Sequence, residues 1–525
     1  MKIKRLITST VIFIVIFIGL LFFITNKSSD MNKGFYLDGE KLLNDDYVFV
    51  ENDNYFINYE LLVDTDIIDS FNDTDSRYIQ IFYKNFLYEI NYNIESNTYK
   101  RQGEKLFINL NYIKSKTNYN IEIFEKGEYI FADLVYNLGK TIDSSKIRKD
   151  KCLNSGIIKK IEKNQEVKIY KLYNNWALVR FRSSVGYVML EDLESISNEI
   201  VKNIKNIKTN ENKIVAWDLF NRKAETIANY VYYKGLDVIA PTWHSLDKEE
   251  FFTDWYLEEY YNYYKNRNVF VWGVFSNSFD RDLTSYYLRD RVRRKQTVEK
   301  IIEISKKYSY DGINLDFENL HYEDRDYLTA FIKELYIEAI KNNFVFSVDI
   351  TAVSKSQNWS LIYDREEIGK YSDYIALMAY DATTNPEQGI GPIASLPWVE
   401  DAVIELKEIT KSNNIILGVP FYTRLWEITE GANGIHRDST ALRVKSAQSF
   451  VEDNKIPIKF DNKVKQNYGE KKIGNTTYKI WIEDDLSLEY RIDLVRNYNL
   501  KGIAIWALDY STDELWLKIH NKTQK

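Results

Sequence analysis

The sequence predicts an α/β fold, in which a C-terminal (β/α)8 TIM barrel follows a transmembrane helix, an N-terminal α+β module and a small β-barrel. Three observations support this prediction. Apolar strand-like runs alternate with helical segments over residues 210–522, short β-forming segments fill residues 33–195, and an uncharged apolar run lies near the N-terminus. With 525 residues, 45% of them hydrophobic and 28% charged, the chain is long enough for several globular domains.

The N-terminal segment has the features of a membrane anchor. Lys2, Lys4 and Arg5 precede residues 6–25, a mostly aliphatic run without charge, and about 20 apolar residues span a bilayer core as a helix. Positive residues before such a helix favour placing the following chain outside the cytoplasm. We therefore expect residues 1–27 to form an uncleaved single-pass anchor. A cleaved signal peptide is the alternative, but its apolar region is shorter and ends in a small-residue site, which "FITNKSSD" lacks.

Residues 33–142 read as short strands separated by Asn, Asp and Gly, as in "DYVFVENDNYFINYELL" and "RYIQIFYKNFLYEINYN". The segments "DGEKLL…YFINYELL" and "QGEKLFINLNYI" hint at a repeated unit. The pattern resembles the small α+β module of the N-terminal domain of copper amine oxidases, which recurs in cell-surface proteins of Gram-positive bacteria. The resemblance implies a spacer or binding module without catalytic residues.

Residues 143–195 have a different pattern, with Trp176 followed by a Val–Arg strand and then by "VGYV" at Val185–Val188. This stretch resembles the bacterial SH3-like domain, a module that commonly binds cell-wall material. The alternative is a barrel in which Trp176 and Tyr187 serve only as core residues. Residues 196–212 read as a polar linker or a short helix.

Eight apolar strand-like runs follow, and the segments between them have apolar residues at helical spacing. This alternation predicts the (β/α)8 barrel over residues 210–522. The long interval before the last run predicts an insertion at about 427–483. The eight runs are residues 213–219, 236–243, 269–275, 312–318, 344–352, 373–380, 415–422 and 502–508.

The fourth run contains the alternating stretch "GINLDFE", residues 312–318. Side chains of a strand alternate between two faces, so its apolar residues pack under the helices and its polar residues point into the barrel. These polar residues are Asn314, Asp316 and Glu318, and Glu318 lies nearest the C-terminal rim, where active sites of this fold are found. Burying such groups is costly unless they are paired. We therefore interpret them as functional residues rather than as the solvent-exposed face of an edge strand.

Asp316 and Glu318 have a spacing that suits general acid catalysis. Their Cα atoms lie about 6.6–6.8 Å apart on one strand, so both carboxyl groups face the same side of a bound molecule. A neighbouring carboxylate raises the pKa of a general acid, which suits protonation of a leaving oxygen near neutral pH. Two such carboxylates cannot flank a sugar ring, as the usual glycosidase scheme requires. The nucleophile must therefore come from elsewhere.

The stretch "DGINLDFE", Asp311 to Glu318, resembles the D-G-x-x-x-D-x-E signature of family 18 glycoside hydrolases, in which the acetamido group of the substrate is the nucleophile. The resemblance implies that Glu318 is the general acid and then the general base, and that Asp316 orients the acetamido group. Asp311 and Gly312 would be structural. Many members carry a further Asp where this chain has Asn314, so Asp316 lacks one like-charged neighbour here.

Further matches lie at the ends of other runs. Tyr380 and Asp381 belong to "MAYD" (378–381), and Trp506 belongs to the last run. In the family, this Tyr donates to the acetamido carbonyl, the Asp contacts the substrate, and the Trp forms the floor under the reacting sugar.

The segments "APTWHSL", "GVFSNSF", "GVPFYTRLW" and "YKIWIEDDLSL" resemble the cortical-fragment-lytic and related peptidoglycan-directed branch of the family, which cuts after N-acetylglucosamine in wall or cortex glycan. That resemblance adds Asn277, Tyr422 and Arg424 as substrate-binding candidates. Members of the branch commonly carry LysM-type repeats, whereas this chain has an SH3-like module and an anchor. We therefore expect a retaining, substrate-assisted glycosidase in the cell membrane, facing the wall. A chitinase with the same mechanism and a catalytically inactive glycan-binding protein are the alternatives.

Several other classes of function have little support. The net charge of −7 provides no general electrostatic basis for binding nucleic acid, and we interpret the one basic cluster, Arg291 to Lys295, as a solvated helix face. The single cysteine, Cys152, excludes an internal disulfide. The four histidines lack ligand spacing, so we expect no metal and no cofactor. The oligomeric state is left open.

Overall fold

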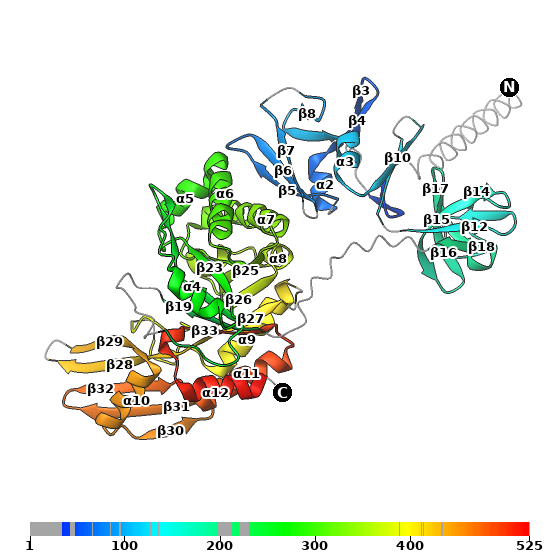
Figure 1. Cartoon of the computed structure of the whole chain (residues 1–525). Helices are drawn as coiled ribbons and strands as arrows, with labels where there is room; N and C mark the ends of the chain where they lie inside the picture. The colour runs from blue at the N-terminus through cyan, green and yellow to red at the C-terminus, as the bar shows by residue number, and fades with distance from the viewer. Residues whose placement is uncertain are drawn as a thin grey trace, which may run out of the picture. The chain divides into compact units, whose positions relative to one another are not determined.

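The computed structural model describes residues 34–523, apart from gaps at 43–47, 66, 84–85, 94–95, 126–127, 135, 198–212, 220–229, 388, 411, 413 and 432–433. The chain divides into two compact units, Met1–Asn206 and Ile207–Lys525 (Figure 1). The predicted anchor helix, residues 6–25, lies outside the described residues. In the described part of the chain, no helix is long and apolar enough to cross a membrane.

The first unit starts with a module of mixed helix and strand. It has one sheet in the order β10-β11-β1-β2, a second in the order β3-β4-β9-β8 and a third in the order β5-β6-β7. The elements are β1 Gly34–Leu37, β2 Glu40–Leu42, β3 Val48–Glu51, β4 Asn54–Asn58, α2 Tyr59–Asp64, β5 Asp69–Asp73, β6 Tyr78–Tyr83, β7 Phe86–Asn91, β8 Tyr99–Gln102, β9 Lys105–Asn109, α3 Leu110–Lys116, β10 Asn120–Phe124 and β11 Tyr129–Asp133.

The repeated segments of this module form two equivalent strand–helix units. Asn58 ends β4 and caps α2 by accepting a hydrogen bond from Leu61 N, and Asn109 ends β9 and caps α3 in the same way from Asn111 N. Strands β4 and β9 pair antiparallel with Ile57 opposite Ile108, so the two copies are related by a local two-fold arrangement. Such asparagine caps contribute about 1 kcal/mol each.

The rest of the first unit is a seven-stranded sheet in the order β14-β13-β17-β16-β15-β12-β18. It begins at Asn137, a few residues before the predicted start at residue 143, because β12 pairs with both β15 and β18. The resemblance of this sheet to SH3-like domains stays a prediction. Its strands are β12 Asn137–Thr141, β13 Ser145–Arg148, β14 Ile157–Ile161, β15 Glu166–Tyr173, β16 Trp176–Phe181, β17 Ser184–Met189 and β18 Leu193–Ser197.

The second unit contains a closed barrel of eight parallel strands, which confirms the predicted α/β barrel. Its strands follow one another around the barrel in the order β20-β19-β33-β27-β26-β25-β24-β23, and β23 pairs with β20 to close it. Seven of the eight predicted runs contain a whole barrel strand, and the run 269–275 contains all of β23 except its last residue. The strands are β19 Lys213–Asp218, β20 Val238–Pro241, β23 Phe270–Ser276, β24 Gly312–Asp316, β25 Val345–Thr351, β26 Tyr374–Met378, β27 Ile415–Pro420 and β33 Gly502–Trp506.

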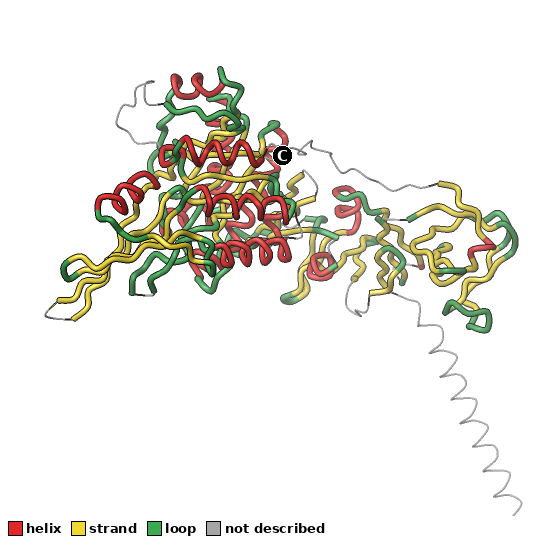
Figure 2. The backbone as a smooth tube through the Cα atoms, turned by 90° about the horizontal axis from the view of Figure 1, so that it is seen from below, coloured by secondary structure: helices red, strands yellow, loops and turns green. Residues whose placement is uncertain are grey.

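Helices cover the outside of the barrel, as Figures 1 and 2 show. The described helices around it are α4 Glu258–Lys265, α5 Arg281–Arg289, α6 Arg291–Lys307, α7 Arg325–Lys341, α8 Arg365–Lys370, α9 Leu396–Thr410, α11 Asp485–Asn497 and α12 Asp513–Thr523. A short hairpin of β21 His244–Asp247 and β22 Phe251–Phe252 follows β20. Inside, a core rich in Trp and small aliphatic residues, including Trp217, Trp272 and Ala504, fills the barrel below its C-terminal rim.

An insertion leaves the barrel where β27 ends, at the rim that carries the predicted site. It starts at Tyr422 rather than near residue 427 and forms a sheet in the order β29-β28-β32-β31-β30, whose long β28–β29 hairpin projects from the second unit in Figure 2. The helix α10 packs on this sheet around Leu425, Ala447 and Ile480. The elements are β28 Tyr422–Gly431, β29 Gly434–Arg443, α10 Val444–Asp453, β30 Ile458–Asp461, β31 Gln466–Ile473 and β32 Thr476–Ile482.

The basic cluster in α6 is not wholly a solvated face. Arg294 is 0% exposed, and its guanidinium donates to Glu334 of α7 at 2.9 Å. The interpretation of the cluster as a solvated face was therefore wrong for this residue, which joins two helices of the barrel wall.

Candidate active site

The barrel brings the predicted catalytic residues to one rim. Strand β24 ends at Asp316, and Glu318 follows two residues later. Tyr380 and Asp381 directly follow β26, and Trp506 ends β33. Because the strands are parallel and closed into a barrel, their C-terminal ends all meet at this rim, as the sequence predicts.

The alternation of the motif is seen in the structure. Ile313, Leu315 and Phe317 are 0%, 0% and 2% exposed, and Phe317 stacks on Phe331 of α7 with ring centres 5.5 Å apart. Asn314, on the opposite face of β24, is buried inside the barrel. The three apolar side chains therefore anchor the strand to the helix layer, while the polar ones face the barrel interior.

The carboxyl groups of Asp316 and Glu318 differ in how strongly their pKa values are raised. Burial raises the pKa of Asp316 to about 6, and a hydrogen bond with Glu318 partly offsets this rise. Burial raises the pKa of Glu318 well above its usual range, and the charges of Asp316, Asp349 and Asp381 raise it further. Of the two groups, Glu318 therefore keeps its proton to the higher pH, as a general acid requires.

The backbone around Glu318 is clamped from two sides. Asn277, at the end of β23, accepts a hydrogen bond from Glu318 N at 3.0 Å and donates to Glu318 O at 2.8 Å. The hydroxyl of Tyr363 donates to Phe317 O at 2.9 Å. Asn277 is 1% exposed, so it lies behind the acid rather than on the cleft wall where a substrate contact was predicted. Its amide is occupied with holding Glu318.

Tyr380, Asp381 and Tyr422 form a second group on the rim. The hydroxyl of Tyr422 donates to Asp381 Oδ1 at 2.6 Å, and the rings of Tyr380 and Tyr422 pack edge to face at 6.2 Å. Burial, and then the charges of Tyr422 and Glu318, raise the pKa of Tyr380 well above its usual value. Its hydroxyl therefore stays protonated and can donate a hydrogen bond. The hydroxyl of Tyr422 is therefore used in orienting Asp381, and its predicted contact with the substrate stays a prediction.

Two tryptophans connect the last strand to the motif. Trp506 packs edge to face on Trp217 of β19, with ring centres 6.0 Å apart. The indole nitrogen of Trp217 donates to Asn314 Oδ1 at 2.9 Å. Trp506 thus lies beside the polar interior of the barrel, and its role as the floor of the sugar site stays a prediction.

A cleft with a volume of about 780 Å³ opens at Glu318, Tyr380 and Asp381. Its walls come from the end of β25 and the loop after it, and from the loop after β26. The lining residues of these segments are Thr351, Ala352, Val353, Ser354, Ser356, Trp359, Ala382, Thr383, Thr384, Asn385, Gly389 and Ile390. Trp398, at the start of α9, also lines it. This volume suits a pocket for a small ligand, and its Trp, Ser and Thr side chains suit the faces and hydroxyl groups of sugars.

The remaining predicted residues are placed as follows. Asp311 lies at the opposite end of β24, where it accepts hydrogen bonds from Lys265 Nζ at 2.8 Å and Val271 N at 2.7 Å. A Cβ at Gly312 would come within 2.5 Å of the Trp272 ring, which explains the glycine by close packing. Arg424 donates to Ser439 Oγ at 3.0 Å, and its Nε is buried without a hydrogen-bond partner among the described residues.

Sequence reasoning missed Asp349, Ser347 and Tyr363. Asp349 is 2% exposed and accepts a hydrogen bond from Asn314 Nδ2 at 2.7 Å. The signal was present, because "FSVDIT" places Ser347 and Asp349 two residues apart, the same alternation that revealed the catalytic motif. Tyr363 follows a short helical turn, and nothing in its local sequence links it to the site.

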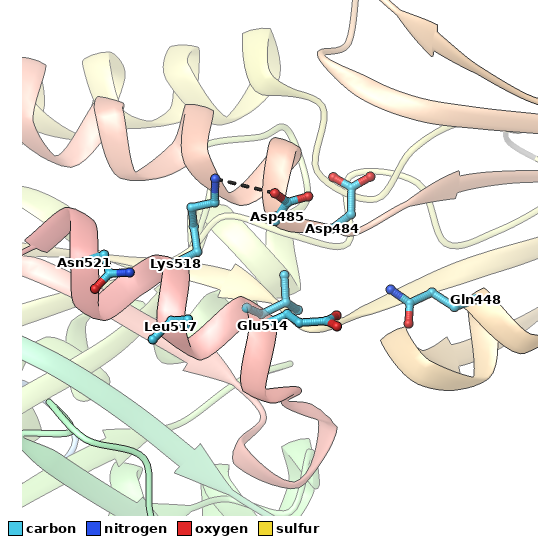
Figure 3. Close-up of a pocket in the computed structure, with 8 residues that line it drawn as sticks. Gln448, Asp484, Asp485, Glu514, Leu517, Lys518 and Asn521 are labelled. Atoms are coloured by element: carbon cyan, nitrogen blue, oxygen red, sulfur yellow. Dashed lines mark ion pairs between the residues drawn. The ribbon is translucent and has the colours of Figure 1, made fainter.

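Other parts of the described structure carry no evident chemistry. No group of three or more His, Cys, Asp or Glu side chains among the described residues is placed to hold a metal ion. A second cavity, of about 510 Å³, lies between α10, α11 and α12 and is lined by Gln448, Asp484 and Lys518 (Figure 3). Charged residues of this cavity stabilise the helices, since Lys518 pairs with Asp485 at 3.5 Å and Asp484 caps α11.

An α/β barrel with a pair of carboxyl groups at its C-terminal rim is the arrangement expected of a glycoside hydrolase, and comparison with known proteins supports this class. Residues 264–511 match the family described as glycosyl hydrolases family 18. Residues 264–511 of the chain therefore form a family 18 glycoside hydrolase domain.

The relatives that resemble this chain share about half of it. It is 29% identical over 279 residues to the uncharacterized glycosylase YvbX of Bacillus subtilis, covering 50% of this chain and 77% of that protein. It is 23% identical over 261 residues to the cortical fragment-lytic enzyme of Bacillus subtilis, covering 48% of this chain and 59% of the relative. The crystal structure of the spore cortex-lytic enzyme SleL of Bacillus megaterium superposes with a TM-score of 0.51 at 18% identity, covering 65% of this chain and 77% of that one. This last similarity bears on the fold alone.

Proposed function

We propose that this protein hydrolyses β-1,4 glycosidic bonds after N-acetylglucosamine in bacterial peptidoglycan, with retention of configuration and with the acetamido group of the substrate as nucleophile. The observation that carries the proposal is the pair of carboxyl groups on one strand, of which Glu318 holds a proton and Asp316 has a pKa of about 6. One acid and one helper on the same side of the sugar suit a reaction in which the substrate supplies the attacking oxygen.

In the first step, the proton of Glu318 passes to the glycosidic oxygen while the acetamido carbonyl oxygen attacks the anomeric carbon. The bond to the leaving sugar breaks, and a cyclic oxazolinium ion forms with its positive charge near Asp316. Asp316 Oδ1 is buried and has no hydrogen-bond partner among the described residues, so it is available to accept from the acetamido N–H. The hydroxyl of Tyr380 would donate to the carbonyl oxygen and hold it in line.

In the second step, ionised Glu318 removes a proton from water, and the water oxygen attacks the anomeric carbon. The oxazolinium ring opens, the acetamido group is restored, and Glu318 regains its proton. Because both attacks occur at the same carbon from opposite faces, the configuration is retained. The clamp by Asn277 keeps Glu318 in one place through both steps.

The choice of peptidoglycan rests on the relatives and on the rest of the chain. One relative is named a cortical fragment-lytic enzyme, and the sequence resemblance points to the same branch. We further propose that residues 6–25 anchor the protein in the cell membrane and that the first unit, with its SH3-like resemblance, holds the enzyme at the wall.

The test is to incubate the purified full chain and its Glu318→Gln variant with peptidoglycan, de-N-acetylated peptidoglycan and chitin, and to identify new reducing ends by mass spectrometry. We expect release of N-acetylglucosamine ends from peptidoglycan by the wild type alone, because glutamine fills the same space but cannot donate the proton. De-N-acetylated glycan should resist cleavage.

Each other outcome points to a different conclusion. Equal cleavage of de-N-acetylated glycan would exclude participation of the acetamido group. Cleavage of chitin but not peptidoglycan would favour the chitinase. Binding to glycan without cleavage of any substrate would show an inactive glycan-binding protein.

A further inference from the structure

Strand β25 places a third carboxyl group beside the catalytic motif. The parallel register pairs Asn314 of β24 with Ser347 of β25. Two positions further along both strands, the same register sets Asp316 alongside Asp349, with Cα atoms about 4.8 Å apart and side chains on the same face. Asp349 is almost fully buried, so it lies inside the barrel next to the reacting groups rather than in the open cleft.

Asp349 determines how Asn314 is oriented. Asn314 Nδ2 donates to Asp349 Oδ1 at 2.7 Å and to Ser347 Oγ at 3.1 Å, and Asn314 Oδ1 accepts from the Trp217 indole at 2.9 Å. Both hydrogens of the amide and its oxygen are therefore used. An acceptor at Asp349 is what turns the amide nitrogen of Asn314 toward β25 and its oxygen toward β19.

The described residues around Asp349 include carboxyl groups and phenols. No Lys, Arg or His forms an ion pair with it among the residues that the structure describes, and the guanidinium of Arg365 donates to Ser360 O at 2.8 Å and Thr351 O at 3.0 Å. Burial, and then the charge of Asp316, raise the pKa of Asp349, while the hydrogen bonds from Asn314 and Trp217 act against this rise. The titratable groups that face it from β24, from the turn after β25 and from the end of β26 are Asp316, Glu318, Tyr363 and Tyr380.

We propose that Asp349 is a positioning residue of the catalytic centre: its carboxyl group orients Asn314 beneath Asp316, and its negative charge helps to hold the proton on Glu318. This inference rests on the proposed function, because it assigns a role relative to the general acid. As the pH rises, Asp316 and Asp349 lose their protons, and each new charge opposes the ionisation of Glu318. The acid form of Glu318 then persists to higher pH than two carboxyl groups alone would allow.

The first test compares the pH dependence of kcat/KM of the full chain with that of Asp349→Asn, using soluble N-acetylglucosamine oligosaccharides. Asparagine keeps the acceptor for Asn314 but removes the charge, so we expect the alkaline limb to shift to lower pH by about one unit. The matched control is Asp373→Asn, at the opposite end of the barrel, where the carboxylate accepts from Phe346 N at 2.9 Å. The control should leave both limbs in place.

Moving the carboxyl group between strands sharpens the test. Asn314→Asp adds a carboxyl group in contact with Asp349 and should move the alkaline limb to higher pH. The exchange variant Asn314→Asp with Asp349→Asn restores one carboxyl group and one amide in contact, so its limb should return close to that of the wild type. The alkaline limb should then lie at the lowest pH in Asp349→Asn and at the highest pH in Asn314→Asp. The wild type and the exchange variant should lie together between them.

A limb that stays in the same place in all variants would overturn the inference, because a purely structural role lowers kcat without moving the limb. An infrared titration of protonated carboxyl groups reports on Asp349 even without turnover, and Asp349→Asn should lose one such group. If the wild type is active but the variants keep its alkaline limb, only this inference is refuted. A wild type that cleaves no glycan refutes the proposed function.

Discussion

At the scale of single residues, Asp316 and Glu318 show how one strand holds two carboxyl groups in different protonation states. Glu318 lines the cleft and Asp316 lies buried beside it, and no Lys or Arg forms an ion pair with either among the described residues. Burial raises both pKa values, but Glu318 also faces three other carboxyl groups, so it keeps its proton longest. The asymmetry comes from the surroundings rather than from the residue types.

This asymmetry predicts a bell-shaped dependence of kcat/KM on pH. Activity requires ionised Asp316, whose pKa is about 6, so the rate should fall as the pH drops below that value. It also requires protonated Glu318, so the rate should fall again as the pH rises through the raised pKa of that group. Initial rates on soluble N-acetylglucosamine oligosaccharides measure both limbs.

The Asp316→Asn variant belongs to the same prediction. Without the charge that stabilises the oxazolinium ion, we expect kcat to fall by roughly 10²-fold or more. The remaining activity should have its alkaline limb at lower pH, because Glu318 loses its strongest like-charged neighbour. A limb at or above the wild-type position would contradict the coupling of the two groups.

At the scale of elements, the end of β23 supports the end of β24. The amide of Asn277 makes two hydrogen bonds to the backbone of Glu318 and one, at 3.0 Å, to Thr284 of α5. A buried amide that holds a catalytic backbone acts on geometry, not on substrate affinity. The sequence placed Asn277 near the site through its motif, but the role of its amide depends on the neighbouring strand.

We therefore expect Asn277→Ala to lower kcat by about 10-fold or more with little change in KM, because two hydrogen bonds worth about 1 kcal/mol each are lost. Asn414→Ala is a matched control, since Asn414 Nδ2 binds Ser372 O at 3.0 Å at the start of β27, away from the rim. Steady-state kinetics with circular dichroism as a folding check measures the effect. A rise in KM at constant kcat would instead support the predicted substrate contact.

At the scale of the whole molecule, a buried ionic cluster in the first unit joins the α+β module to the seven-stranded sheet. Arg180 of β16 donates to Asp133 at the end of β11 at 2.7 Å, and Lys168 pairs with the same carboxylate at 2.9 Å. Tyr170 donates to Asp133 Oδ1 at 2.8 Å. Arg180 and Asp133 are 4% and 1% exposed, so removal of one partner leaves a buried charge that water cannot reach.

The expected result for Arg180→Met is a loss of about 3 kcal/mol in the stability of the first unit. Hydrogen–deuterium exchange should accelerate in both β10–β11 and β15–β16, since Glu122 of β10 also pairs with Arg180. Arg182→Met is the control, because Arg182 follows the same strand on the surface. Activity on soluble oligosaccharides should not change, as the barrel is a separate compact unit. Unchanged exchange in β10–β11 would show that the cluster does not join the two parts.

The sequence by itself determined the barrel, its eight strands and the inward face of the catalytic motif, because alternation and helical spacing are local properties of the chain. It also singled out Glu318, Asp316, Tyr380 and Asp381, which share one rim once the strands run parallel. The tertiary structure alone decided which side chains meet across strands. Asp349 contacts Asn314, and Arg294 pairs with Glu334 some 40 residues away. The alternation of "FSVDIT" marks Asp349 as inward-facing, but its partner depends on strand register, as the partner of Arg294 depends on helix packing, because these bring distant segments together.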